Sequence, residues 1–234
     1  MRFDVSSRQA LLSFVKLNQK STRGPEKGSV RAMLDQRRHQ RIRFSTPPVV
    51  TIGHGGAVGS GEIENLSLSG LMMRTDLPLT IGQTAGCEFS VFGSPIIDVP
   101  ATVVSRVGNL YGARFQTGPI NQILIEDAID SALASGKASI LSVHELGGRR
   151  VMRIVGGLVG ALRNDFMHSL TRVGVDEIDL GGVTAVEQAG LALCLVAVNR
   201  HGAAIGAQSE VFGGAWALVQ AMPGANSQES AGVS

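Results

Sequence analysis

The chain has 234 residues, of which 44% are hydrophobic and 17% are charged, so it is long enough for two domains and apolar enough to form packed cores. This composition excludes an intrinsically disordered chain. The formal net charge is only +2, but residues 1–43 carry eleven Lys or Arg and three Asp or Glu, whereas the remaining residues carry ten and sixteen. A strongly basic N-terminal region is expected to meet an anion: a phosphate ligand, nucleic acid or an anionic membrane surface.

Residues 1–33 are predicted to form a basic arm and linker. Residues 8–17 bring four apolar side chains together at helical spacing, which predicts a short helix that docks on a neighbouring domain. Residues 18–31 are rich in Lys, Ser, Gly and Pro without apolar periodicity, which predicts a mobile linker. The arm lacks the features of a signal peptide, and the longest apolar run, residues 191–198, is too short to span a bilayer. We therefore expect a cytoplasmic protein with no membrane span.

The segment after the arm is rich in arginine. Residues 35–41 read DQRRHQR, with Arg37 and Arg41 four residues apart and Arg38 between them. An arginine guanidinium is a rigid, permanently charged fork that pairs with phosphate oxygens, grips the O6 and N7 edge of guanine, or stacks on a base. The five arginines within residues 31–43 therefore favour a specific anion site over a diffuse basic tail.

A second polar segment, NLSLSG, occupies residues 65–70. Asn65 and Ser67 alternate, so on a strand both side chains point to one face, where they offer short hydrogen-bond donors and acceptors. Gly70 leaves room for a ligand to approach the backbone closely. The Gly-rich residues 53–61 before this segment lack the Gly-Lys-Ser/Thr ending of a phosphate loop and are predicted to be a flexible hairpin loop. Together the two polar segments predict recognition of a nucleotide and not catalysis.

Six short alternating segments separated by Gly and Pro predict the strands of a small antiparallel barrel. These segments span residues 48–52, 61–66, 71–74, 85–91, 97–106 and 111–115. Residues 121–133 then place apolar and acidic side chains at helical spacing, which predicts a helix that caps or flanks the barrel.

The motif R-x-x-x-R at residues 37–41, followed by N-x-S-x-x-G at residues 65–70, resembles the signature of PilZ domains, which bind the bacterial second messenger cyclic di-GMP. Each motif alone is weak evidence, whereas their order and spacing together are specific. The resemblance continues through GLMMRTDLPLTIGQTAGCEFSV, PATVVSR and YGARF, and it implies a PilZ-like domain at residues 34–135. It also implies that cyclic di-GMP is bound by Arg37, Arg38, Arg41, Asn65, Ser67 and Gly70.

After residues 135–137 the pattern changes to strands interleaved with helices, which predicts a second, α/β domain at residues 138–224 and a disordered tail at residues 225–234. The expected elements are a hairpin of residues 139–143 and 150–155, a helix at 161–172, a strand at 177–180, a helix at 188–199, a strand at 203–207 and a helix at 214–222. The fold class predicted for the whole chain is therefore a six-stranded antiparallel barrel with a flanking helix, followed by an α/β sheet with helices.

Residues 177–208 resemble the core of STAS domains, the anti-sigma-factor-antagonist fold, in which a strand ending D-L-x-G-V leads to a turn and a helix. Where that family carries a phosphorylated serine, this chain reads Glu187-Gln188-Ala189-Gly190. The resemblance therefore implies a protein-interaction domain that is not switched by phosphorylation at this turn. Thr184 is the nearest hydroxyl, and we expect it to serve the strand end.

Catalytic and metal-binding patterns are missing from the sequence. Cys87 and Cys194 lie in segments predicted to be buried, which favours core residues over a disulfide or a metal site. The five histidines have no metal-ligand spacing, and neither a serine nucleophile nor a cysteine with a base partner is evident. We expect no metal, no cofactor and no enzymatic activity.

Three functions remain after these exclusions. The chain is a cyclic di-GMP receptor that relays the ligand by conformational change to a protein-interaction domain, a degenerate PilZ–STAS scaffold without ligand, or a nucleic-acid-binding protein that uses the basic arm. The intact motifs favour the first, with a protein as the partner of the second domain. The single Tyr and single Trp lie outside the basic segment, so a base-stacking platform for nucleic acid is missing. Because the arginines directly follow a predicted linker, ligand binding is expected to order the arm.

Overall fold

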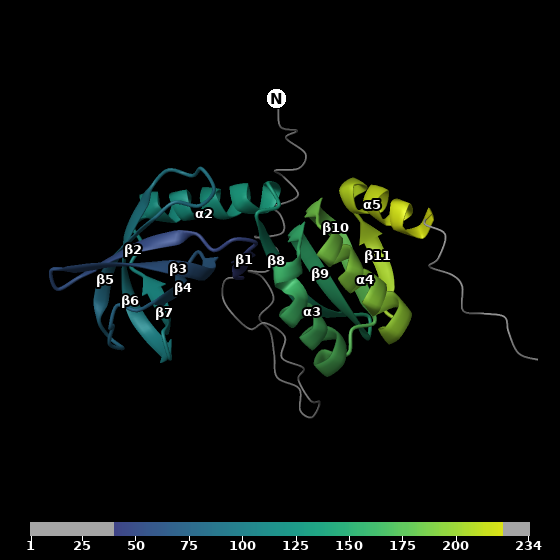
Figure 1. Ribbon diagram of the computed structural model, residues 1–234, viewed down its shortest axis with the longest axis horizontal. Helices are drawn as coiled ribbons and strands as arrows, with labels where there is room; N and C mark the ends of the chain where they lie inside the picture. Colours follow the sequence, from purple (N-terminus) through teal and green to yellow (C-terminus); the bar gives the residue numbers. More distant parts are fainter. Residues whose placement is uncertain (1–39, 222–234) are drawn as a thin grey trace, which may run out of the picture.

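The computed structural model describes residues 40–221, which form a barrel and an α/β unit side by side (Figure 1). The strands of the first part are β1 (Ile42–Phe44), β2 (Val49–His54), β3 (Ala57–Ser67), β4 (Gly70–Thr75), β5 (Thr84–Phe89), β6 (Ile97–Val107) and β7 (Leu110–Phe115). Helix α2 (Pro119–Ala134) follows, and then the strands β8 (Ala138–Leu146), β9 (Arg149–Leu158), β10 (Glu177–Val186) and β11 (Ala204–Gln208). The remaining helical segments are η1 (Gly160–Leu162), α3 (Arg163–His168), η2 (Ser169–Val173), α4 (Gln188–His201) and α5 (Glu210–Ala221).

Strands β2 to β7 form a closed antiparallel barrel. Neighbours follow the order β3-β2-β5-β6-β7-β4, and the pairing of β4 with β3 closes the ring. Alternate residues of a strand point into the barrel, as in β5, where Ala85, Cys87 and Phe89 are buried and the residues between them are exposed. The six-stranded barrel predicted from the alternating segments is therefore confirmed.

The Gly-rich hairpin between β2 and β3 differs from the prediction. The sequence predicts a loop over residues 53–61, but only Gly55 and Gly56 form the turn, with the positive φ values of 56° and 81° that a tight turn needs. The residues on either side continue the β2–β3 ladder without a gap. Backbone hydrogen bonds alone therefore hold the other glycines of this segment in strands.

Strand β1 joins the barrel to the α/β unit. On one side it pairs antiparallel with β3, and on the other side it pairs antiparallel with β8. Arg43 accordingly lies opposite Asn65 of β3 and opposite Ser139 of β8. Because of this double pairing, the eleven described strands form one continuous sheet, with β11 at its open end and the barrel at the other.

Helix α2 lies along the barrel and ends where the barrel meets the α/β unit (Figure 1). It begins with Pro119 in its first turn, a position that lacks a backbone hydrogen-bond partner in any helix, and it buries Ile125, Ala128, Ala132 and Leu133. These side chains share the core of the barrel, and Ile140 and Val155 from the α/β unit belong to the same core. The predicted flanking helix is confirmed, and it also ties the two parts together.

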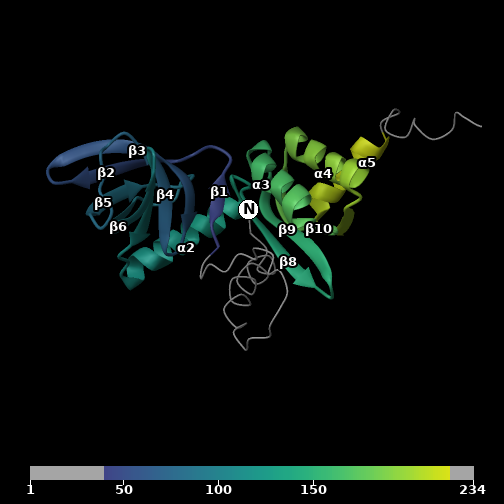
Figure 2. The ribbon, with the colours of Figure 1, turned by 90° about the horizontal axis from the view of Figure 1, so that it is seen from below.

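The α/β unit has an antiparallel hairpin, β8–β9, followed by the parallel pairs β9–β10 and β10–β11. Figure 2 shows α3, α4 and α5 on one side of these strands. Their apolar side chains form a second core with the strands, in which Phe166, Cys194 and Phe212 are fully buried. The order of elements predicted for this part of the chain is confirmed.

Two boundaries in the α/β unit differ from the prediction. The strand expected at residues 177–180 continues to Val186, because parallel pairing with β9 resumes after an irregularity at Gly182. The last helix begins at Glu210 and not at residue 214, because the Ser209 hydroxyl accepts a hydrogen bond from the Phe212 N–H, at 3.2 Å, and so caps the first turn. The predicted arm at residues 1–33 and the predicted tail at residues 225–234 lie outside the described residues.

Glycines at the joint between the two parts allow backbones to touch, and Gly156 provides a test. Its φ is +87°, and a Cβ there would lie 2.2 Å from the Ala138 carbonyl oxygen, whereas Gly148, with φ +79°, has nothing within 4 Å. We expect Gly148→Ala to lower the free energy of unfolding by about 1 kcal/mol through backbone strain alone. Gly156→Ala should lower it by about 3 kcal/mol, because β8 and β9 must also separate. Urea denaturation of both variants measures this difference, and equal losses would show that the joint tolerates the extra atom.

Candidate functional site

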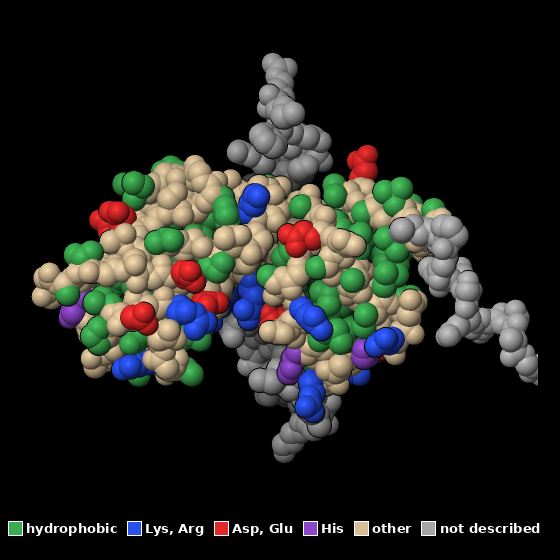
Figure 3. Space-filling view, in the orientation of Figure 1, with side chains coloured by type: hydrophobic (Ala, Val, Ile, Leu, Met, Phe, Trp, Pro, Cys, Tyr) green, Lys and Arg blue, Asp and Glu red, His purple; other side chains and the backbone are tan. Residues whose placement is uncertain are grey.

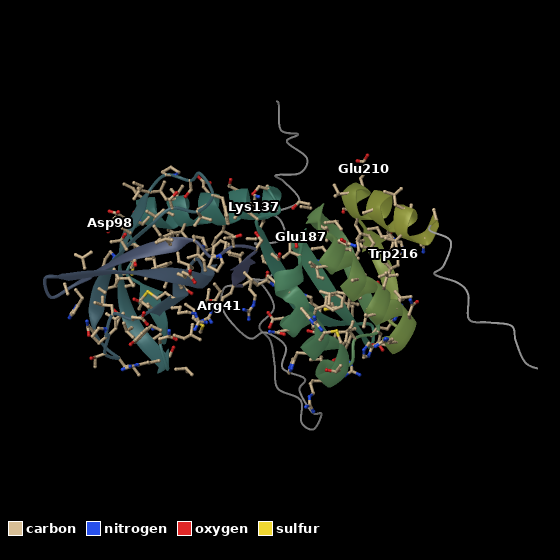
Figure 4. All side chains as sticks on the ribbon, in the orientation of Figure 1. Arg41, Asp98, Lys137, Glu187, Glu210 and Trp216 are labelled. Carbon is tan, nitrogen blue, oxygen red and sulfur yellow. The ribbon has the colours of Figure 1, made fainter. Side chains whose placement is uncertain are left out.

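Four of the six residues predicted to bind a ligand fall within the part of the chain that the structure describes. These are Arg41, Asn65, Ser67 and Gly70. Arg37 and Arg38 lie outside the described residues, so their roles stay predictions. Figure 4 labels Arg41, which lies on the side of the barrel next to the α/β unit.

Strand register brings the described members of this set to one face. Ser67 lies directly opposite Gly70, and continuing the β1–β3 register by one residue places Arg41 opposite Ser67. Leu66, which alternates with Asn65 and Ser67, is fully buried and faces the barrel interior. Asn65 and Ser67 therefore share the outer face, as their alternation predicts, while their role as ligand contacts stays a prediction.

A β-bulge in β3 sets this orientation. Ile63 pairs with Met73 and Asn65 pairs with the adjacent Met72, so Glu64 is the extra residue of the bulge. Ile63 and Leu66 both face inward although three residues separate them. Without the bulge, Asn65 would fall on the same face as Ile63 and point into the apolar core. The extra residue is what places a polar pair on the outside of the barrel.

Asn65 is buried although it lies on this outer face. The residue is 6% exposed, and its Oδ1 has no hydrogen-bond partner among the described residues. A buried amide oxygen left unpaired costs on the order of 1 to 3 kcal/mol. Ser67, by contrast, is satisfied, because its hydroxyl donates to the Gly70 carbonyl oxygen at 3.0 Å. The hydroxyl of Ser67 therefore serves the fold, whereas the amide oxygen of Asn65 does not.

The structure explains, as the sequence could not, why residue 70 is a glycine. A Cβ at this position would lie 2.1 Å from the Ala113 carbonyl oxygen of β7. Strand β4 therefore needs a glycine here to pair with β7, whether or not a ligand is bound. Room for a ligand, the reason predicted from the sequence, is not needed to explain this residue.

Charged side chains surround the Asn65 face. Arg43 forms an ion pair with Asp165 of α3, and Arg74 forms one with Glu64 at 2.8 Å. Figure 3 shows Lys, Arg, Asp and Glu side chains near the middle of the molecule, where the barrel meets the α/β unit. A phosphate ligand on this face would meet guanidinium groups that already have carboxylate partners.

Comparison with known proteins places the barrel in a family. Residues 35–134 match the family model described as PilZ domain. The barrel is a PilZ domain. None of the curated proteins matches this chain as a relative.

Solved structures that resemble part of the chain include a PilZ domain. The PilZ domain of YcgR from Escherichia coli, solved with c-di-GMP, is 17% identical, with 42% of this chain and 91% of that chain covered and a TM-score of 0.37. The Bacillus subtilis inhibitor of motility (MotI/DgrA) is 15% identical, with 46% and 57% covered and a TM-score of 0.37. PlzA from Borreliella burgdorferi, solved in complex with c-di-GMP, is 20% identical, with 53% and 47% covered and a TM-score of 0.27.

The turn after β10 is held by contacts with the end of β9 and the segment that follows it. The Glu187 carboxylate accepts a hydrogen bond from the Gly160 N–H at 3.2 Å, and a Cβ at Gly190 would lie 2.2 Å from the Leu158 carbonyl oxygen. Figure 4 marks Glu187 at this place. Thr184 donates its hydroxyl to the Leu133 carbonyl oxygen of α2 at 2.6 Å. The threonine therefore ties the end of β10 to the helix of the PilZ domain, in agreement with a role at the strand end.

Neither cysteine has the environment of a nucleophile. Both are free and fully buried. Burial, with a smaller contribution from Asp98, raises the pKa of the Cys87 thiol to about 11, and burial raises the pKa of the Cys194 thiol to about 12. Both thiols therefore stay protonated at neutral pH, and the prediction that they are core residues is confirmed.

One serine–histidine pair was not predicted from the sequence. Ser142 Oγ lies 2.9 Å from His144 Nε2 on β8, a contact that the two-residue spacing on a strand produces. Burial and the nearby Arg153 lower the pKa of His144, against a smaller opposite effect of Asp179. The Asp179 carboxylate is held by Arg153 Nε at 2.6 Å and by the Gly181 N–H at 3.0 Å. Within residues 40–221 no carboxylate is hydrogen-bonded to this imidazole, so the pair lacks the third group of a catalytic triad.

Residues 40–221 hold neither a metal-binding cluster nor a helix able to span a membrane. No cluster of three or more His, Cys, Asp or Glu side chains within residues 40–221 has the geometry to hold a metal ion. Among the helices of this range, none combines the length and apolar character that crossing a membrane requires.

The unpaired oxygen of Asn65 predicts that this residue can be replaced without loss of stability. Asn65→Leu keeps the side-chain volume and removes the buried oxygen, so we expect the free energy of unfolding to stay within about 1 kcal/mol of the parent or to rise. Ser67→Ala, which breaks a satisfied buried hydrogen bond, is the matched control and should lower it by about 1 kcal/mol. Chemical denaturation measures both. A loss of several kcal/mol in Asn65→Leu would show that the amide serves the fold after all.

Proposed function

We propose that this protein is a cyclic di-GMP receptor and that the PilZ domain binds the ligand on the face that carries Asn65. The observation that supports this most is the Asn65 amide oxygen, which lies buried beside Ser67 and has no hydrogen-bond partner within residues 40–221. A fold seldom retains such a group without a use, because an apolar residue of the same size would be more stable there. The proposed contacts are Arg37, Arg38, Arg41, Asn65, Ser67 and Gly70.

The chemistry of the ligand fits these side chains. Cyclic di-GMP carries two phosphates and two guanines. Arginine forks suit the phosphate oxygens and the O6 and N7 edge of guanine, which lysine cannot grip in the same way. Asn65 Oδ1 is an acceptor, and the N2 amino group of guanine is a donor, so a guanine would satisfy the oxygen that the fold leaves unpaired. Adenine has no amino group at this position, which would make the site selective for guanine.

The α/β unit is proposed to be the output domain. Residues 177–208 resemble the STAS core, and the hairpin followed by two parallel strands agrees with such a unit. In place of a phosphorylatable serine, the turn has Glu187, whose carboxylate bonds to a backbone N–H. We therefore propose a protein-interaction domain that is controlled by the ligand on the PilZ domain and not by phosphorylation of this turn.

Calorimetry with purified protein tests the receptor function. Cyclic di-GMP should bind, and GTP and cyclic GMP should bind far more weakly, because each offers only one guanine. Arg41→Ala and Arg37→Ala should each lose about ten- to a hundredfold in affinity, since a charge-assisted contact in a partly desolvated site contributes on the order of 1.5 to 3 kcal/mol. Arg41→Lys should also bind weakly, because it keeps the charge but not the fork. Variants that bind as tightly as the parent would remove these arginines from the site, and a parent that binds nothing would leave the scaffold function.

Mass spectrometry of protein from its native host tests the proposed output. We expect no phosphate on Thr184, because its hydroxyl is hydrogen-bonded to the Leu133 carbonyl oxygen and is only partly exposed. A phosphate there would replace a satisfied donor with negative charge next to the end of α2. Stoichiometric phosphate at this threonine would show that the switch has moved within the domain and has not been lost.

A further inference from the structure

One arginine outside the R-x-x-x-R motif lies closer to Asn65 than the motif would suggest. Arg43 is the central residue of β1 and lies directly opposite Asn65 in the β1–β3 ladder. Side chains of directly opposite residues share a face, with Cβ atoms about 5 Å apart. The guanidinium of Arg43 therefore starts from the same face as the unpaired Asn65 oxygen.

The Arg43 side chain contacts the α/β unit. Its Nη2 donates to Asp165 Oδ1 at 3.3 Å, and its Nε forms an ion pair with Asp165 Oδ2. Asp165 belongs to α3, so a single side chain links the ligand face of the PilZ domain to a helix of the output unit. The two side chains are 46% and 40% exposed, which makes this pair weak enough for another anion to compete with it.

The side chain of Arg43 can move at this place while its backbone is held. The backbone of β1 is paired on one side with Asn65 and on the other with Ser139, so the strand is held from both edges. The long, half-exposed side chain can rotate about its own bonds without breaking either ladder. A switch here needs no movement of the sheet.

We propose that Arg43 is a further ligand contact and the link to the output unit: bound cyclic di-GMP draws its guanidinium from Asp165 to a ligand phosphate. This inference rests on the proposed function. The exchange leaves the Asp165 carboxylate on α3 without its cation, so the α/β unit presents a negative charge in the bound state that is neutralised in the free state. A ligand phosphate can compete with this carboxylate because the exposed ion pair is weak, whereas a charge-assisted contact beside the buried Asn65 would meet little competition from water. A partner protein with an Arg or Lys on its surface would bind the uncompensated Asp165 carboxylate of α3 more tightly.

Binding of cyclic di-GMP to Asp165 variants, measured by calorimetry, tests the exchange. Asp165→Asn removes the competitor but touches no proposed ligand contact, so it should bind about two- to fivefold more tightly than the parent, which is the range for an exposed ion pair. Arg43→Ala should bind about tenfold more weakly. Glu177→Gln is the matched control, because it breaks the Arg149–Glu177 pair and should leave affinity unchanged. Arg149 lies at the β8–β9 turn, at the other end of β8 from the residues that pair with β1.

A double variant separates competition from a general effect of charge. If Asp165 acts only through Arg43, Asp165→Asn has no effect in the Arg43→Ala background. A gain of the same size in both backgrounds would mean that Asp165 acts through its long-range field, and the proposal would fail. It would also fail if Asp165→Asn bound as tightly as the parent or more weakly. Absence of binding by the parent is a different result, which overturns the receptor function itself.

Discussion

The double pairing of β1 is the constraint on which the arrangement depends. Three residues, Ile42 to Phe44, connect a closed barrel to an α/β sheet by pairing with a strand of each. Ile42 and Phe44 are 1% and 5% exposed, so the strand is anchored in the barrel core, and Arg43 between them must point outward. The same alternation that buries the two apolar residues fixes the direction of the arginine. The position of the charge is thus a consequence of the packing of its neighbours.

A second constraint, the bulge at Glu64, decides what that arginine faces. Side chains of a barrel strand point alternately into the core and outward. If β3 had one residue fewer before Asn65, the polar side chains near its end would point into the core. The extra residue restores Leu66 to the interior and places Asn65 and Ser67 outside. Asn65 is nonetheless buried, which produces a solvent-poor polar position on an outer surface. Such a position strengthens hydrogen bonds and ion pairs to a ligand, because little water competes for them.

Much of the fold could be predicted from the sequence, because long alternating or helical patterns carry their own signal. The six barrel strands, α2 and the order of the α/β elements follow from such patterns. Strand β1 could not be predicted, since three residues with a charge at the centre have no measurable period, and its structure comes from partners far away in the chain. The Gly-rich hairpin was predicted to be a loop. Backbone pairing between β2 and β3 nevertheless keeps Gly53 in β2 and Gly59 and Gly61 in β3, although glycine usually weakens a strand.

The residue types of the candidate site could be predicted from the sequence, but their burial and hydrogen bonding could not. The motif spacing identified Arg41, Asn65 and Ser67, and the structure places them on one face. The sequence could not show that Asn65 Oδ1 is buried and unpaired, because burial depends on the bulge and on the neighbouring strands. Nor could it show that a side chain at Gly70 would meet the Ala113 carbonyl oxygen, while the ligand role of Gly70 stays a prediction. Arg43 was counted only as one basic residue among five, since its partner Asp165 is 122 residues away.

The joint between the two parts limits how a signal can travel. A rotation of the α/β unit against the barrel would break the β1–β8 ladder, the Thr184 bond to Leu133 and the 2.9 Å bond from the Ser45 N–H to the Lys137 carbonyl oxygen. It would also divide a core to which both parts contribute, as Ile140 and Val155 pack with the barrel residues. Packed interfaces of this kind switch between discrete arrangements and do not deform gradually. A ligand that contributes a few hydrogen bonds to one face cannot offset such losses. Side chains at this joint can therefore rearrange without such losses, as long as the backbone ladders stay intact.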